Sequence, residues 1–168
     1  MVNPDDSRTM TSGENTAPPP LGPLLTFAAV VPIAAGSAFL WIGDPAQSYI
    51  TVSMTLLWSA AILAFLAGVR HAVSFRHPGG TTIAQGGTML WLYGLGFATI
   101  VETVWAYTLT ATTLAILGFL SLAILDPIAA KRGEAPLFFA SLRSVQMAIP
   151  IVALVALGVY VWLSPLFA

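Results

Sequence analysis

Long apolar runs separated by short polar segments occupy the chain from residue 21 onward. A helix of roughly 20 apolar residues crosses the hydrocarbon core of a bilayer, which is about 30 Å thick. Runs of about this length occur at residues 21–42, 49–74, 83–102, 107–125 and 142–163. The pattern predicts an all-α fold: a polytopic membrane bundle of five transmembrane helices within residues 21–168.

Turn-forming residues separate the apolar runs. Residues 43–45 (Gly-Asp-Pro) end the first run, and Asp44 is placed to cap a new helix that begins with proline. Residues 77–80 (His-Pro-Gly-Gly) end the second run, and residues 126–141 contain enough proline and glycine to predict a loop. Prolines inside the first and last runs, Pro32 and Pro150, are expected to kink their helices.

The first twenty residues differ from the rest. Residues 1–20 are polar and end in three consecutive prolines, so we expect a disordered tail. The segment lacks the basic start of a secretory signal, and we expect the apolar run after it to be retained as a span.

Composition supports a membrane protein. Apolar residues make up 57% of the chain and charged residues 8%, whereas about 25% of residues are charged in ordinary globular domains. The net charge of −1 argues against nucleic-acid binding, which requires a basic surface. The sequence contains no cysteine, which excludes disulfides, thiolate metal sites and thiol catalysis.

The charges also predict an orientation. All six Lys and Arg residues lie in the tail, at 70–76 or at 131–143, and five spans would place these segments on one membrane face. The other face receives Asp44 and Glu102. Short loops rich in Lys and Arg stay in the cytoplasm, so we expect a cytoplasmic N-terminus and an outside C-terminus. The expected location is a bacterial inner (plasma) membrane.

Aromatic residues support the same orientation, because an interfacial belt of Trp and Tyr is typical of membrane proteins. Those near the predicted outer ends are Trp41, Tyr49, Trp105, Tyr107, Tyr160 and Trp162.

Small residues recur at intervals of about four in two predicted spans. Small side chains let membrane helices approach closely, so these stripes are candidate packing surfaces. Alternatively, they reflect only the frequency of Ala and Gly in membrane helices. The residues are Ala60, Ala64, Gly68 and Ala72 in the second span and Gly86, Gly94 and Ala98 in the third, with Gly96 beside them.

Three aromatic residues lie deeper than the belt. We expect Trp58, Trp91 and Tyr93 to fill the bundle core and to need polar partners there, or else to stack on a planar ligand such as a quinone. Glu102, at an outer helix end, is expected to reach interfacial water, with a proton relay as the alternative.

The predicted cytoplasmic rim contains Arg70, His71, Asp126 and Arg143. Three interpretations remain open. The cations are topology signals and lipid anchors; or Asp126 pairs with Arg70 or Arg143 and joins helices two, four and five; or the rim binds a phosphate or lipid head group.

No catalytic signature is present, and we expect no enzyme, cofactor or metal site. His71 and His77 miss the four-residue spacing that places two ligands on one helix face. The absence of an inverted repeat argues against many transporter folds.

The expected function is a non-enzymatic scaffold or accessory subunit. The alternative is a small transporter or lipid-handling protein that uses the basic rim. Expected partners are membrane lipids, with other membrane proteins or a homo-oligomer left open.

Two stretches carry a family resemblance. Residues 60–71 end in Gly68-Val69-Arg70-His71, and a later stretch runs from Asp126 to Arg143. Both resemble the domain of unknown function 3429 family, proteins like transmembrane protein 69. The resemblance covers about residues 22–163 and implies a polytopic membrane fold without an assigned activity.

The resemblance points to a small set of positions, which are Phe65, Gly68, Arg70, Asp126 and Arg143. This chain departs from the family pattern at the rim. His71 replaces a tryptophan, Ala72 a glycine, and residues 138–139 (Phe-Phe) a Trp-Tyr pair.

Overall fold

All regular structure in the described part of the chain is helical. The computed structural model describes residues 24, 27–75, 81–131 and 139–167. Its α-helices are α2 (Val31–Ile42), α3 (Ser48–Ser74), α4 (Ile83–Val104), α5 (Thr108–Lys131) and α6 (Phe139–Leu163), with 3-10 turns at Pro45–Gln47 and Pro165–Phe167. The predicted all-α class is therefore confirmed for these residues.

Four of these helices are long and apolar enough to cross a membrane, which fits a multi-pass membrane protein. They correspond to α3, α4, α5 and α6. The remaining helix, α2, is apolar but only 12 residues long. At 1.5 Å per residue it extends about 18 Å, less than the hydrocarbon core.

The run expected to form the first span is interrupted within the described residues. Residues 27 and 28 are helical, Ala29 and Val30 form a turn, and α2 begins at Val31 with Pro32 in its first turn. Proline is tolerated at a helix start because the amide it lacks would have no partner there. Pro32 therefore begins a helix instead of kinking one.

The Ala29 carbonyl at this interruption has a partner on another helix. Trp58 Nε1 in α3 donates to the Ala29 oxygen at 2.9 Å. The indole N–H of Trp58 therefore supplies a hydrogen bond to a carbonyl group at the interruption of the helix.

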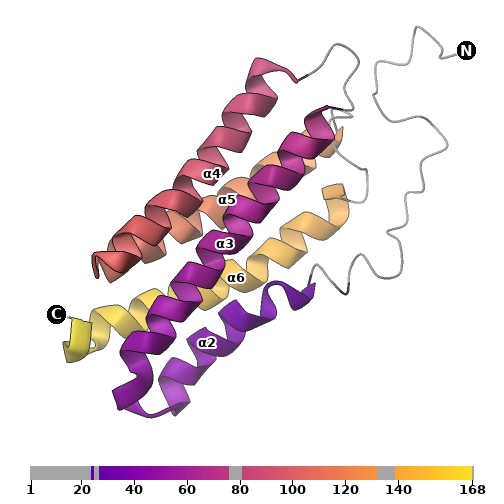
Figure 1. Cartoon of the computed structure of the whole chain (residues 1–168). Coiled ribbons are helices and arrows are strands. Elements are labelled where there is room, and N and C mark those ends of the chain that lie inside the picture. The colour runs from indigo at the N-terminus through magenta and orange to yellow at the C-terminus, as the bar shows by residue number, and fades with distance from the viewer. Residues whose placement is uncertain (1–23, 25–26, 76–80, 132–138, 168) are drawn as a thin grey trace, which may run out of the picture.

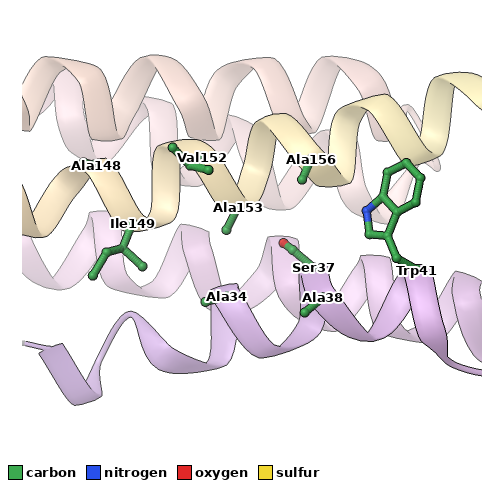
Figure 2. A pocket seen from close by; sticks show the side chains of 9 residues that line it. All are labelled: Ala34, Ser37, Ala38, Trp41, Ala148, Ile149, Val152, Ala153 and Ala156. Carbon is green, nitrogen blue, oxygen red and sulfur yellow. The ribbon is translucent and has the colours of Figure 1, made fainter.

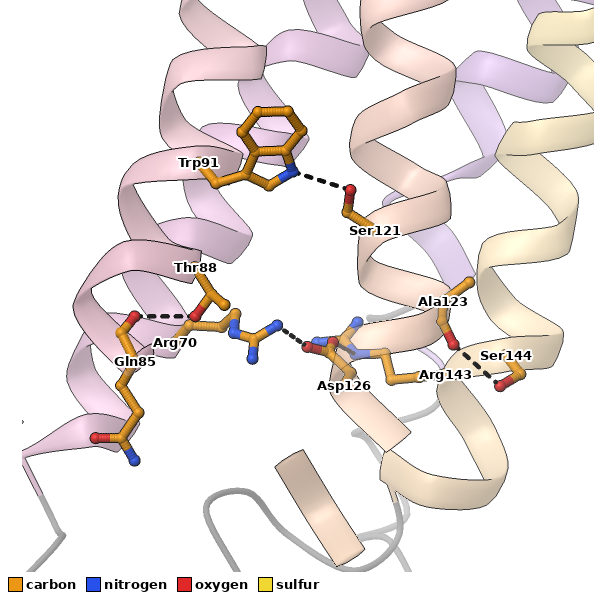
Figure 3. Close-up of polar contacts among 9 residues, drawn as sticks. All are labelled: Arg70, Gln85, Thr88, Trp91, Ser121, Ala123, Asp126, Arg143 and Ser144. Carbon is orange, nitrogen blue, oxygen red and sulfur yellow. Dashed lines mark hydrogen bonds and ion pairs between the residues drawn. The ribbon is translucent and has the colours of Figure 1, made fainter. Parts of the chain in front are cut away.

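Helix α5 continues past the predicted loop start at residue 126 and ends at Lys131, with Pro127 inside it. A proline at this position supplies no amide for the Ala123 carbonyl one turn earlier. The Ser144 hydroxyl of α6 donates to that carbonyl at 3.4 Å (Figure 3). The neighbouring helix therefore compensates for the proline, which explains why α5 does not end there.

The long helices run antiparallel to their neighbours in sequence (Figure 1). Each packs against the next, α6 also packs against α2, and α3 packs against α5. The C-terminal ends of α3 and α5 lie beside the N-terminal ends of α4 and α6; we call this end of the bundle the rim end. The α2–α3 and α4–α5 turns and the end of α6 form the opposite end.

Large apolar side chains fill the centre of the bundle. Leu56 and Leu63 from α3, Phe119 from α5, and Met147 and Leu154 from α6 are all fully buried. The same core also includes Ile33 of α2 and Leu92 of α4, so all five helices contribute to it.

Glycines allow close approach at several helix interfaces. A Cβ at Gly96 would lie 3.0 Å from the Ala60 carbonyl oxygen, and one at Gly118 would lie 2.5 Å from Leu63 Cδ1. The close contacts are Gly36 with Thr55 (α2–α3), Gly96 with Ala60 (α3–α4) and Gly118 with Leu63 (α3–α5).

This pattern corrects the predicted packing stripes. Ala60 is buried and Ala64 half-buried, and both face Gly96. Added Cβ atoms at Gly68, Gly86 and Gly94 would meet no described atom within 4 Å, so these glycines do not form the contact predicted for them. The glycine of α4 that contacts α3 is Gly96, two positions after the predicted Gly94.

The deep aromatic residues also differ from expectation. Trp58, Trp91 and Tyr93 have exposed fractions of 44%, 53% and 54%, so they do not fill the core. In a membrane they would face lipid. The expectation that the indole groups need polar partners is confirmed, since Trp58 bonds to Ala29 and Trp91 Nε1 donates to Ser121 Oγ at 3.0 Å.

Candidate functional site

Three charged residues from three helices meet at the rim end (Figure 3). Arg70 Nη1 of α3 lies 2.8 Å from Asp126 Oδ1 of α5. Arg143 Nε of α6 lies 3.0 Å from Asp126 Oδ2. The predicted pairing of Asp126 is therefore confirmed, and with both arginines.

The cluster extends along α6 to Gln146, whose Oε1 accepts a 3.0 Å hydrogen bond from Arg143 Nη1. We call Arg70, Asp126, Arg143 and Gln146 the ion cluster. Residue exposure is 3% for Asp126, 5% for Arg143 and 2% for Gln146. The side chain of Arg70 is 16% exposed, so it is the member that reaches the surface.

Helix geometry explains why these residues meet. Arg70 lies one turn before the end of α3, while Asp126 and Arg143 lie just over one turn from the ends of α5 and α6. These helix ends share the rim end, so the three residues have similar depths. A charge inside an apolar helix is costly unless it is paired, which favours the contacts observed.

Both carboxylate oxygens of Asp126 are engaged by arginine side chains. Each of its two oxygens faces a guanidinium group, and the side chain is almost entirely shielded. A carboxylate held in this way acts as an acceptor and connects α3, α5 and α6. It is poorly placed to serve as a general base or as a proton relay.

Two hydrogen bonds that involve hydroxyl groups connect α4, or the residue just before it, to α3 and α5 in the rim-end half of the bundle. Ser74 Oγ, at the end of α3, lies 2.8 Å from Thr81 Oγ1, just before α4. The Trp91–Ser121 bond joins α4 to α5 on the side of the ion cluster nearer the bundle centre (Figure 3). All four long helices are thus connected by polar contacts in this half of the bundle.

The other predicted rim residue, His71, is not part of the ion cluster. Its ring contacts Phe75 with centroids 4.6 Å apart, and its Nδ1 atom is buried without a partner among the described residues. Residues 27–75, 81–131 and 139–167 contain no group of three or more His, Cys, Asp or Glu side chains that could hold a metal. Arg76 and Arg132 lie outside the described residues.

Glu102 lies on α4 near the opposite end and is half-buried. The ion pairs of the described residues do not include it. Its position near the C-terminal end of α4 agrees with the predicted end of that helix. Its outward orientation and its contact with interfacial water stay predictions.

Gln146, Ser144 and the Trp91–Ser121 bond were not predicted as parts of the site. The contact of Gln146 could have been predicted from the sequence, because an amide three residues after an arginine in an apolar helix needs an internal partner. Ser144 and Ser121 carry no such signal, since a helical hydroxyl can bond to its own backbone.

The chain has no match among protein family models, curated proteins or solved structures.

Proposed function

We propose that this chain is a multi-pass protein of the bacterial inner (plasma) membrane that acts as a non-enzymatic scaffold or accessory subunit. The observation that carries the proposal is the ion cluster, in which the intramembrane charges of three helices engage one another. A transport or catalytic site would instead present such groups to a cavity or a substrate.

The outer surface of the bundle suits contact with lipid and with other membrane helices. Exposed apolar side chains occur on every long helix, and on α4 they include Leu90, Phe97 and Val104. The grooves found on the described part of the bundle are lined mainly by apolar side chains. A surface of this kind supports packing against membrane partners.

In the proposed topology all five apolar segments cross the membrane. The rim end faces the cytoplasm together with the N-terminus, and the C-terminus lies outside. The positions of Arg70 and Arg143 at one end of the bundle support this orientation. The aromatic residues of the opposite end, such as Trp105 and Trp162, are largely exposed, as a belt at the outer interface would be.

The exposed edge of Arg70 supports the second candidate, a lipid-handling role. One guanidinium nitrogen binds Asp126, and part of the side chain remains open at the rim. An arginine at this level can bind a lipid phosphate. Membership of the domain of unknown function 3429 family remains a proposal that rests on the resembling residues around Arg70, Asp126 and Arg143.

Co-isolation tests the scaffold role. The tagged chain is extracted with its lipids in polymer nanodiscs, and proteins and lipids are identified by mass spectrometry. The scaffold proposal predicts a membrane protein present at a constant ratio. Recovery of the chain alone, with anionic lipids that are lost in the Arg70→Gln variant but kept in Glu102→Gln, would contradict it and favour lipid handling.

A further inference from the structure

Arg70 of α3 lies behind the seam between α4 and α5 at the rim end. Helix α3 packs against both α4 and α5. Leu63, two turns before Arg70 on the same face of α3, packs against Gly118 of α5. Figure 3 shows the Arg70 side chain passing Thr88 of α4 toward Asp126 of α5. Its guanidinium group is therefore placed between the two helices.

The guanidinium group of Arg70 has donors and charge to spare. It carries five N–H donors. Among the described residues its side chain makes one hydrogen bond, from Nη1 to Asp126 Oδ1 at 2.8 Å. Asp126 divides its single negative charge between Arg70 and Arg143. The side chain of Arg70 is also 16% exposed, so it can bind an anion in addition to Asp126.

An exposed indole ring lies on the bundle-centre side of Arg70. Trp91 of α4 donates across the seam to Ser121 of α5, and 53% of Trp91 is exposed (Figure 3). Ser121 comes five residues before Asp126, so the Trp91 bond lies about 7.5 Å deeper in the bundle. The head-group region of a bilayer is about 5–8 Å thick on each side. When Arg70 lies among the phosphates, Trp91 therefore lies at the edge of the hydrocarbon.

The surface around Trp91 leaves room for an apolar chain. Gly87 lies one turn from Trp91 on the same face of α4, toward the rim end. A Cβ added at Gly87 would meet no described atom within 4 Å. Leu117 and Ile124, one turn to either side of Ser121, are exposed on α5. The seam thus combines a cationic group with a deeper apolar surface.

The groove between α2 and α6, of about 510 Å³, lacks this combination (Figure 2). Small and apolar side chains form most of its lining, and none of the described residues that line it is charged. It offers no group that would select one lipid head over another. The charge of Arg70 is what distinguishes the α4–α5 seam.

We propose that the seam between α4 and α5 binds an anionic phospholipid, with its phosphate on Arg70 and an acyl chain over Trp91. Guanidinium groups form strong, charge-assisted hydrogen bonds to phosphate oxygens. The inference names the ligand of the lipid-handling candidate and rests on the proposed membrane location. A bound lipid is also compatible with a scaffold, so a protein partner found by co-isolation leaves this inference unchanged.

Quenching of tryptophan fluorescence by brominated acyl chains tests the site. The chain is reconstituted in equal amounts of phosphatidylglycerol and phosphatidylcholine, with bromine on one lipid or the other. The fluorescence that Trp91→Phe removes should come from a site that prefers phosphatidylglycerol about fivefold. Trp58→Phe is the matched control, because Trp58 is similarly exposed on α3 and its signal should show no preference. Equal quenching of the Trp91 signal by the two lipids would overturn the proposal and leave the scaffold role standing.

Three variants separate Arg70 from general attraction to basic residues. Arg70→Gln should abolish the preference, whereas Arg132→Gln removes the same charge elsewhere in the chain and should preserve it. Gly87→Leu should also abolish the preference, because it fills the space beside Trp91 while the ion cluster stays intact. Equal losses in the two arginine variants, or an unchanged preference in Gly87→Leu, would contradict the site. Loss of the preference on addition of inorganic phosphate would assign Arg70 to a soluble anion and overturn the proposal.

Discussion

At the scale of single residues, the ion cluster determines how three helices meet. Asp126 lies between Arg70 and Arg143, and any one of them alone would be a costly charge inside an apolar bundle. Buried ion pairs of this kind contribute little net stability compared with well-packed apolar residues, but removal of one partner is expensive. The cluster therefore favours one arrangement of α3, α5 and α6 over alternatives.

Replacement of the shared carboxylate tests this role. Asp126→Asn leaves two arginines without their counter-charge, and we expect the free energy of unfolding to fall by about 3 kcal/mol. Denaturation with sodium dodecyl sulfate in mixed micelles measures this change. Glu102→Gln, at the opposite end of the bundle, serves as the control and should change the free energy by less than about 0.5 kcal/mol. Equal effects of the two variants would mean that the cluster does not hold the helices.

Pro127 and Ser144 form a second testable pair. Ser144→Ala removes the donor to the Ala123 carbonyl, and a loss of about 0.5–1 kcal/mol is expected. In a Pro127→Ala background the new amide serves that carbonyl, so Ser144→Ala should then cost nothing measurable. The double-mutant cycle uses the same denaturation assay. Equal losses in both backgrounds would show that the serine does not compensate for the proline.

The ion pairs could be predicted from sequence because Arg70, Asp126 and Arg143 lie at similar depths in apolar helices. Charges in that setting need partners, and few partners exist. Trp91 and Ser121 could not be predicted in the same way. Their bond depends on how α4 and α5 are rotated, which the apolar pattern does not specify.

At the scale of helices, packing depends on which glycines face a neighbour. The predicted stripe through Gly86 and Gly94 faces open space, and Gly96 makes the contact with Ala60. A membrane helix is apolar on every side, since both lipid and neighbouring helices accept apolar groups. The apolar pattern therefore locates the long helices along the chain but does not show which face of each helix points inward.

A pair of variants in one helix tests this assignment. Gly96→Val introduces atoms against the backbone of α3, and overpacking should lower the free energy of unfolding by about 1–3 kcal/mol. Gly94→Val, two residues earlier, adds the same group in open space and should be close to neutral. The two are compared by the same denaturation titration. A greater loss for Gly94→Val would restore the stripe predicted from sequence.

At the scale of the whole molecule, the number of membrane crossings depends on α2. Helices α3 to α6 are long enough to span, whereas α2 contributes 12 residues after the turn at Ala29–Val30. The apolar pattern predicts one uninterrupted span at 21–42, because a proline inside an apolar run can kink a continuous helix as well as start a new one. Five crossings place the two termini on opposite sides, and four place them on the same side.

Cysteine accessibility decides between these topologies most directly, because the natural chain has no cysteine. Ser7→Cys in the tail and Ser164→Cys after α6 are each treated with a membrane-impermeant maleimide in intact cells and after permeabilisation. The five-span bundle predicts that Ser164→Cys is labelled in intact cells, while Ser7→Cys is labelled only after permeabilisation. Labelling of both residues under the same single condition would place the termini together and contradict the five-span bundle.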